Sequence, residues 1–205
     1  MSSGRPSLRV LERELGPDHP DLASLYHNLG GLAHARRRFA RGEPFARRAV
    51  AIRERALGPR HPLAAADRAA LAAILAGRRR DDEAERLYRG ALRIFERVYG
   101  PRDYEVAVTC QNLGALLYAR GDHHAEAARL YRRALAIKER LLGRGHPDTA
   151  ITAANLAALH ARRGQRREAA RLYRRALRIF ERVLGPSHPS AIVTRESFAR
   201  LGAGS

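Results

Sequence analysis

The sequence predicts an all-α fold, a right-handed α-solenoid of stacked antiparallel helix hairpins. Three observations predict it. A Leu-Gly-Pro-x-His-Pro pattern recurs, strictly or in looser form, at steps of 42 or 43 residues. Two amphipathic segments, with apolar residues three and four positions apart, fill each step. The chain is 45% hydrophobic but only 6% aromatic and has no Trp, so small side chains must make the close contacts, which suits helices packed near one another.

The recurring pattern divides the 205 residues into a single solenoid of four repeats. Its copies begin at residues 15, 57, 99, 142 and 184, and the one longer step comes from an extra residue in the turn at 121–124. Self-similarity at such a fixed period indicates a repeat architecture. We expect an unpaired helix in 1–16, repeats at 17–58, 59–100, 101–143 and 144–185, and an unpaired helix in 186–205.

The same pattern places the helix ends. Its Gly suits the left-handed position after a helix, and its second Pro suits the first turn of the next helix, where a missing N–H costs nothing. The His before that Pro is expected to belong to the turn and not to a metal site. The expected helices are 5–15, 20–36, 40–56, 62–77, 82–98, 103–119, 124–141, 147–162, 166–183 and 189–201.

Each repeat pairs two kinds of helix. The second helix reads Tyr-x-x-Ala-Leu-x-Ile from Tyr88, Tyr131 and Tyr173, which makes one apolar stripe that includes the tyrosines. The first helix carries Asn-Leu followed by Gly or Ala, and the small residue lets the partner helix approach. The first two repeats depart from these patterns, which predicts looser packing around residues 36–46 and 77–82.

These residues resemble the tetratricopeptide repeat, in the 42-residue form seen in kinesin light chain and many bacterial proteins. The usual unit of the family has about 34 residues. The resemblance implies a protein–protein interaction scaffold whose first helices line a concave groove, in which asparagines hold the backbone of an extended peptide. By this resemblance the peptide-binding positions are Asn28, Asn112 and Asn155. A carboxamide both donates and accepts, so it can hold any peptide unit. The alternative is that each Asn bonds an adjacent loop or helix end.

Neighbouring positions on the same helix face complete the expected groove. They are Gln111, Tyr118, His27, His34, Val108, Ile151 and Arg162. This surface is expected to be small, mildly apolar and nearly uncharged, without the lysine and arginine clamp that holds a C-terminal carboxylate in some relatives. We therefore expect a short internal segment of a partner, with Val108 and Tyr118 as apolar contacts.

A second candidate surface is basic. The net charge is +18, and Lys138 is the only lysine among 39 basic residues. Arginines three and four apart on the second helices are expected to form a basic convex face, either a solvated surface or a docking site for nucleic acid or an acidic protein. Its residues are Arg86, Arg89, Arg93, Arg129, Arg132, Arg171, Arg174 and Arg178.

Other classes of function find little support in the sequence. Cys110 is the only cysteine, so an intramolecular disulfide is impossible. No Gly-rich phosphate loop or catalytic constellation is recognisable, and we expect no enzyme, no metal and no cofactor. The chain has no apolar run long enough for a membrane span and no apolar signal-peptide core, so a soluble cytoplasmic protein is expected.

Two alternatives concern assembly. The unpaired terminal helices are the two halves of one hairpin, so head-to-tail self-association is the alternative to the expected monomer. Arrays of this kind are often attached to bacterial regulatory ATPases or caspase-like proteases. A sensor or oligomerisation part of a larger bacterial regulatory protein is therefore the third interpretation.

Overall fold

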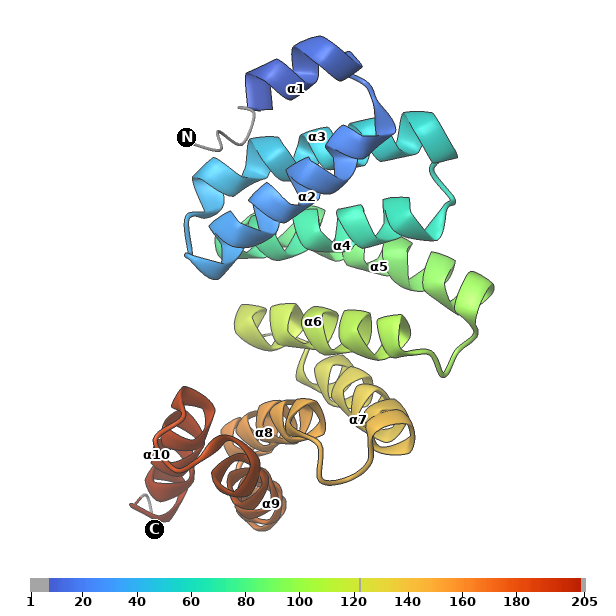
Figure 1. Cartoon of the computed structure of the whole chain (residues 1–205). Helices are drawn as coiled ribbons and strands as arrows, with labels where there is room; N and C mark the ends of the chain where they lie inside the picture. Colours follow the sequence, from blue (N-terminus) through green and yellow to red (C-terminus); the bar gives the residue numbers. More distant parts are fainter. Residues whose placement is uncertain (1–7, 122, 204–205) are drawn as a thin grey trace. The chain divides into compact units, whose positions relative to one another are not determined.

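The structure, a computed structural model, describes residues 8–121 and 123–203, which contain ten helices and no strand (Figure 1). The all-α prediction is confirmed, and the expected helix ends differ from those found by one or two residues. Residues 5–7 of the first expected helix lie outside the described residues. The helices are α1 (Leu8–Leu15), α2 (Pro20–Ala35), α3 (Phe39–Leu57), α4 (Pro62–Gly77), α5 (Asp81–Tyr99), α6 (Tyr104–Arg120), α7 (His124–Leu142), α8 (Pro147–Arg162), α9 (Arg166–Leu184) and α10 (Pro189–Ala203).

The chain forms two compact units, Met1–Val98 and Tyr99–Ser205. In the first unit α2 packs on α3 and α3 packs on α4. In the second unit α6 packs on α7, α7 on α8, α8 on α9, and α9 on α10. Short turns join these helices in Figure 1, so neighbours run antiparallel. The prediction of stacked helix hairpins is confirmed within each unit.

Small residues allow the helices to pack closely, as expected. The tyrosines of the second helices are buried, at 2% exposure for Tyr88 and Tyr131 and 5% for Tyr173. A Cβ atom on Gly114 would lie only 3.3 Å from the Tyr131 ring. The absence of a side chain at Gly114 therefore sets how near α6 lies to α7.

The connectors between repeats differ from the prediction in the backbone of the glycine. Gly58 has the expected positive φ, 85°, but its ψ of 155° is extended and not left-handed helical, a conformation that L side chains rarely adopt. His61 then caps α4, because its Nδ1 accepts a hydrogen bond from the backbone N–H of Leu63 at 3.2 Å. The equivalent bond recurs in three other connectors, with His19, His146 and His188 as acceptors. In the remaining connector the carboxylate of Asp103 takes this role, at 2.8 Å from the N–H of Glu105.

The turns inside the hairpins are less uniform. Gly121 and Gly164 have positive φ values of 90° and 73°. The equivalent residues of the first two repeats are Arg37 and Arg79, which adopt φ values of 54° and 61°. Two arginines therefore hold a conformation that costs an L-residue about 1–2 kcal/mol.

The expectation of looser packing around residues 36–46 and 77–82 is wrong. A Cβ atom on Gly42 would lie 2.9 Å from the Cβ of Ala33, and one on Gly77 would lie 2.6 Å from the Phe39 ring. The glycines thus mark close approach, and not a missing contact.

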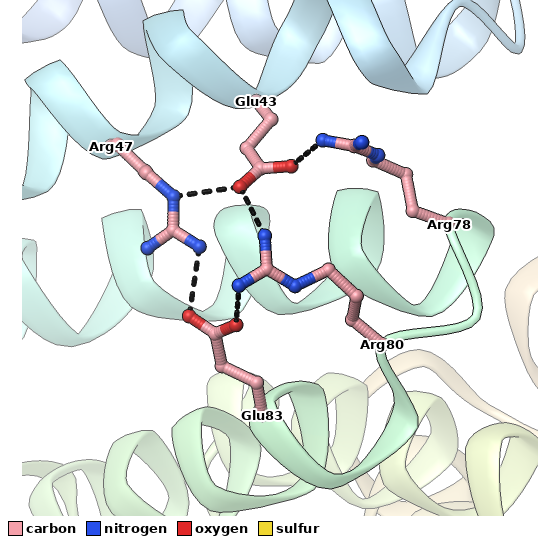
Figure 2. A network of polar contacts seen from close by, with 5 residues as sticks. All are labelled: Glu43, Arg47, Arg78, Arg80 and Glu83. Carbon is pink, nitrogen blue, oxygen red and sulfur yellow. Dashed lines mark hydrogen bonds and ion pairs between the residues drawn. The ribbon is translucent and has the colours of Figure 1, made fainter.

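A network of charged side chains strengthens the same region (Figure 2). Glu43 is only 6% exposed and accepts hydrogen bonds from Arg47 and Arg80, both at 2.7 Å, and from Arg78. Glu83 pairs with Arg47 and Arg80 in turn. Burial alone would raise the pKa of Glu43, but hydrogen bonds from Arg47 and Arg78 outweigh it and lower that pKa. The network joins α3 to the turn before α5 and to α5 itself.

The terminal helices cover neighbours of their own unit. On α1, Leu8 and Leu11 pack against the cluster that contains Tyr26. On α10, the ring of Phe198 lies 6.3 Å from that of Tyr173, and the guanidinium of Arg174 lies 5.8 Å from the Phe198 centroid. These contacts bury part of the apolar surface on which the head-to-tail alternative depends. The oligomeric state stays a prediction.

None of the helices in the described ranges is both long enough and apolar enough to cross a membrane.

Candidate functional site

The three asparagines of the expected groove have unused hydrogen-bonding capacity. Asn112 on α6 and Asn155 on α8 are half-buried, and Asn28 on α2 is exposed. Within residues 8–121 and 123–203, none of these carboxamides has a hydrogen-bond partner, so the bonds to adjacent loops or helix ends that the alternative requires are not present. Each carboxamide can therefore donate to and accept from a ligand.

Two apolar side chains lie one turn before the asparagines of the second unit. Val108 precedes Asn112 on α6 and is half-buried, while Ile151 precedes Asn155 on α8 and is exposed. Since α6 also contacts α8, these four residues form a mixed apolar and amide surface. We call it the α6–α8 surface.

A cavity of about 450 Å³ lies where α6 and α8 end. The Arg162 guanidinium lies 5.3 Å from the centroid of the Tyr118 ring and donates a 3.1 Å hydrogen bond to the Tyr118 carbonyl. Three guanidinium groups and two phenol rings favour an anionic ligand with some apolar surface. The lining residues are Tyr118, Ala158, Ala161, Arg162, Arg166, Tyr173, Ser197, Arg200 and Leu201. We call it the Arg162 cavity.

The expectation of a nearly uncharged surface is wrong at this end of α8. Arg166 begins α9 and Arg200 lies near the end of α10, so both lie outside the first-helix face from which the groove was predicted. Their convergence on Arg162 depends on how α8, α9 and α10 pack. In the sequence, only the high arginine content of the chain indicated that these arginines could converge.

Gln111, a further expected groove residue, takes part in an internal network. Its Oε1 accepts a 2.9 Å hydrogen bond from Nζ of Lys138 and another bond from the Thr152 hydroxyl. Lys138 is 1% exposed, and its Nζ also lies 2.9 Å from Oδ2 of Asp148. Gln111 thus helps to satisfy a buried ammonium group between α6, α7 and α8.

The acidic end of that network is well stabilised. The Tyr104 hydroxyl donates a 2.7 Å hydrogen bond to Oδ2 of Asp148, which raises the pKa of Tyr104 to about 12. Burial opposes ionisation of Asp148, but hydrogen bonds from Tyr104 and Lys138 outweigh it and lower the pKa of that carboxyl.

His27 has an equivalent internal role in the first unit. Its Nδ1 lies 2.7 Å from Oδ1 of Asp67, which is 2% exposed, and Arg53 lies 3.0 Å from the other oxygen of that carboxylate. The hydrogen bond to Asp67 raises the pKa of His27. His34 is exposed, and its ring lies 5.6 Å from that of Phe39.

Both networks centre on a basic residue that replaces an aromatic one. Counted along the repeats, Arg53 and Lys138 occupy the position that holds Phe95 and Phe180 in the other two second helices. These networks were not predicted from the sequence. The alternation of a basic residue with Phe at this position of the repeats is the sequence signal that indicates them.

The residues of the expected basic face are mostly exposed. Some have acidic or aromatic partners, including Arg89 with Glu85 at 2.8 Å and Arg171 with Glu168 at 3.5 Å. Arg86, Arg93, Arg129, Arg132, Arg171, Arg174 and Arg178 are exposed, and Arg89 is half-buried. No group of three or more side chains that could hold a metal ion is found in the described part of the chain.

The sequence comparisons identify the family. A sequence model described as tetratricopeptide repeat matches three overlapping stretches, residues 21–89, 63–139 and 112–182. The chain belongs to the tetratricopeptide repeat family. No curated protein matches it.

Solved structures of tetratricopeptide repeat proteins share this fold. A putative kinesin light chain from Podosopora anserina, with nearly identical TPR-like repeats, has a TM-score of 0.74 and 23% identity over 90% of this chain and 87% of its own. BtubC (BKLC) from P. vanneervenii has a TM-score of 0.70 and 29% identity over 83% of this chain and 67% of its own. A Rap protein complexed with Competence and Sporulation Factor has a TM-score of 0.70 and 17% identity over 90% of this chain and 54% of its own.

Membership of the tetratricopeptide repeat family makes the chain a protein–protein interaction scaffold. The tetratricopeptide repeat fold is a scaffold type of fold.

Proposed function

We propose that the chain binds an extended peptide segment of a partner protein along the α6–α8 surface. The observation that carries the proposal is that the carboxamides of Asn112 and Asn155 have no partner within the described residues, while the neighbouring Gln111 is used internally. An extended peptide presents an N–H and a C=O at each residue, and both groups need partners when they lose water. The two carboxamides supply those partners without requiring a particular sequence.

The surroundings favour particular side chains on the peptide. Val108 and Ile151 offer apolar contacts next to the asparagines. The Arg162 cavity adds a place for one negative charge, either an acidic side chain or the C-terminal carboxylate of the peptide. The Rap protein structure supports this assignment, since that fold was solved with a bound factor. In the first unit, Asn28 offers a further carboxamide.

The experiment selects peptides on the wild-type protein from a random library and measures their affinity by fluorescence anisotropy. The double variant Asn112→Ala/Asn155→Ala should weaken binding at least about tenfold, because each lost amide contact leaves peptide groups unsatisfied at about 1–3 kcal/mol. Ser187→Ala, on an exposed connector, is the control and should change the affinity less than about twofold.

Arg162→Gln then tests the preference for a negative charge. It should weaken peptides with an acidic or C-terminal carboxylate in register, and leave neutral amidated versions unchanged. If the asparagine variant binds every selected peptide as well as the wild type does, the proposal is wrong.

A further inference from the structure

A connector of the first unit contains a carboxylate held between two arginines. Asp18 lies between α1 and α2, and its Oδ1 is 3.3 Å from Nη2 of Arg48 on α3. Its Oδ2 pairs with Arg55, about two helical turns further along α3. Arg48 also donates a 2.8 Å hydrogen bond to the Pro17 carbonyl. The chain thus shows which ligand this arrangement of arginines accepts.

The second unit contains the same arginines twice, with no acid at the position of Asp18. Counted along the repeats, Arg48 corresponds to Arg133 and Arg175, which donate to the carbonyls of Pro101 and Arg144, both at 3.1 Å. Three hydrogen bonds therefore fix the same guanidinium in three repeats.

The residue at the position of Asp18 is not an acid in the second unit. Arg55 corresponds to Arg140 and Arg182, whereas the position of Asp18 is occupied by Arg102 in one connector and by Gly145 in the next. The two later repeats thus retain the pair of arginines and lose the acid between them.

Each of these sites opens into a cavity. The first has a volume of about 390 Å³ and is lined by Pro101, Arg102, Arg133, Ala136, Ile137 and Arg140. The second has a volume of about 500 Å³ and is lined by Arg144, Gly145, Arg175, Arg178, Ile179 and Arg182. Ile137 and Ile179 are 5% and 6% exposed, so each cavity combines a buried apolar side chain with several guanidinium groups.

Three of the arginines that line the cavities have no acidic partner among the described residues. Arg175 pairs with Glu139. Arg140, Arg178 and Arg182 have no acidic partner within residues 8–121 and 123–203. Like charges held close together repel one another, and a bound anion relieves that repulsion.

We propose that these two cavities bind carboxylate side chains of an acidic segment of a partner protein, one carboxylate in each cavity. The carboxylate takes the place that Asp18 has in the first unit, and the methylene groups of an Asp or Glu side chain contact Ile137 or Ile179. Asp18 favours a carboxylate over a nucleic-acid phosphate as the ligand. The cavities lie on α7, α9 and their connectors, so this binding is independent of the α6–α8 surface.

The first test measures binding of a fluorescein-labelled deca-glutamate peptide to the full chain by anisotropy. The variant Arg140→Gln/Arg182→Gln removes one arginine from each cavity and should weaken binding about tenfold or more at about 50 mM salt. Arg163→Gln/Arg167→Gln is the control. It removes the same charge from exposed positions of the second unit outside the cavities and should weaken binding less than about threefold.

A second variant fills a cavity from within the chain. Gly145→Asp restores an acid at the position of Asp18, where the added Cβ meets only the mobile end of Arg182, at 2.8 Å. It should keep the fold and lose much of the affinity. Ser187→Asp makes the same charge change in the final connector and should bind as the wild type does.

Three outcomes would overturn the proposal. The first is that the wild type does not bind deca-glutamate at about 50 mM salt. The second is that cavity and control variants lose affinity equally, which would make the attraction one of net charge. The third is that a labelled ten-nucleotide single strand loses more affinity than the peptide in the Arg140→Gln/Arg182→Gln variant, which would make these cavities phosphate sites.

Discussion

Nζ of Lys138 lies 2.9 Å from Oδ2 of Asp148, and this ion pair joins two consecutive helices of the second unit. Lys138 is 1% exposed, so its ammonium group is held away from water and depends on its protein partners. Gln111 supplies another hydrogen bond at 2.9 Å, and the Tyr104 ring lies 5.8 Å from Nζ. The pair is therefore part of a satisfied network in which each member depends on the others.

Lys138→Met should destabilise the second unit by about 2 kcal/mol, because Asp148 and Gln111 lose the charge that they face. The expected loss lies below that of a fully buried pair, since Asp148 keeps Tyr104 and is 24% exposed. Urea unfolding followed by circular dichroism measures the free energy of unfolding. Arg132→Met, on an exposed position of the same helix, should change it by less than about 0.5 kcal/mol. Equal losses in the two variants would show that the network contributes nothing specific.

The His27–Asp67 pair should make stability depend on pH. The pKa of His27 is raised from 6.5 in the folded chain, so its contribution is fully present below pH 6.5 and is lost as the pH rises through the folded pKa. The difference in unfolding free energy between the wild type and His27→Gln should therefore shrink as the pH rises above 6.5. Measuring that difference, and not the wild type alone, removes the contributions of the other histidines. A difference that grows with pH would contradict the assignment.

Arg79→Gly should stabilise the first unit. Arg79 has φ 61°, and Gly adopts this conformation without the steric cost that an L side chain meets. Arg79 is 69% exposed in its 3.3 Å ion pair with Asp81, so the pair should contribute less than the relief of strain. We expect a gain of about 1 kcal/mol in thermal or urea unfolding. Arg163→Gly is the control, because Arg163 has φ −86°, and it should give no gain.

His61→Ala should cost about 1 kcal/mol of stability, because the N–H of Leu63 loses its capping acceptor. His61→Asp should retain most of that stability, since Asp103 makes the same cap in another connector. The two variants can be compared by differential scanning calorimetry. If Ala and Asp behave alike at this position, the cap does not contribute to stability.

Much of the fold follows from local sequence signals. The glycines and prolines of the connectors place the helix ends to within one or two residues, because backbone conformation at those positions depends on the residue itself. The capping histidines were assigned to the turn for the same reason, and His61 has the predicted role, whereas Gly58 shares only the positive φ of the predicted left-handed residue. Candidate ligand contacts such as Asn112 and Asn155 came from the resemblance to the tetratricopeptide repeat, applied to matching positions of this sequence.

The remaining features depend on contacts between helices. Looser packing was predicted around residues 36–46, but the missing side chain of Gly42 accommodates Ala33, which the local pattern does not show. Arg166 and Arg200 meet Arg162 only through the packing of α8, α9 and α10. Hydrophobic periodicity treats a buried Lys138 as a polar surface residue, since it contains no information about the groups that satisfy it.

The alternation of Phe with Arg53 and Lys138 limits how such a chain can be lengthened or shortened. Arg53 pairs with Asp67 of the next repeat. In the repeat that begins with α6, the residue equivalent to Asp67 is Thr109. Deleting the second repeat would therefore place the half-buried guanidinium of Arg53 opposite a hydroxyl group. The smallest segment that recombination could copy or remove with every buried charge still paired is two repeats, and the chain is in this sense a tandem of double repeats.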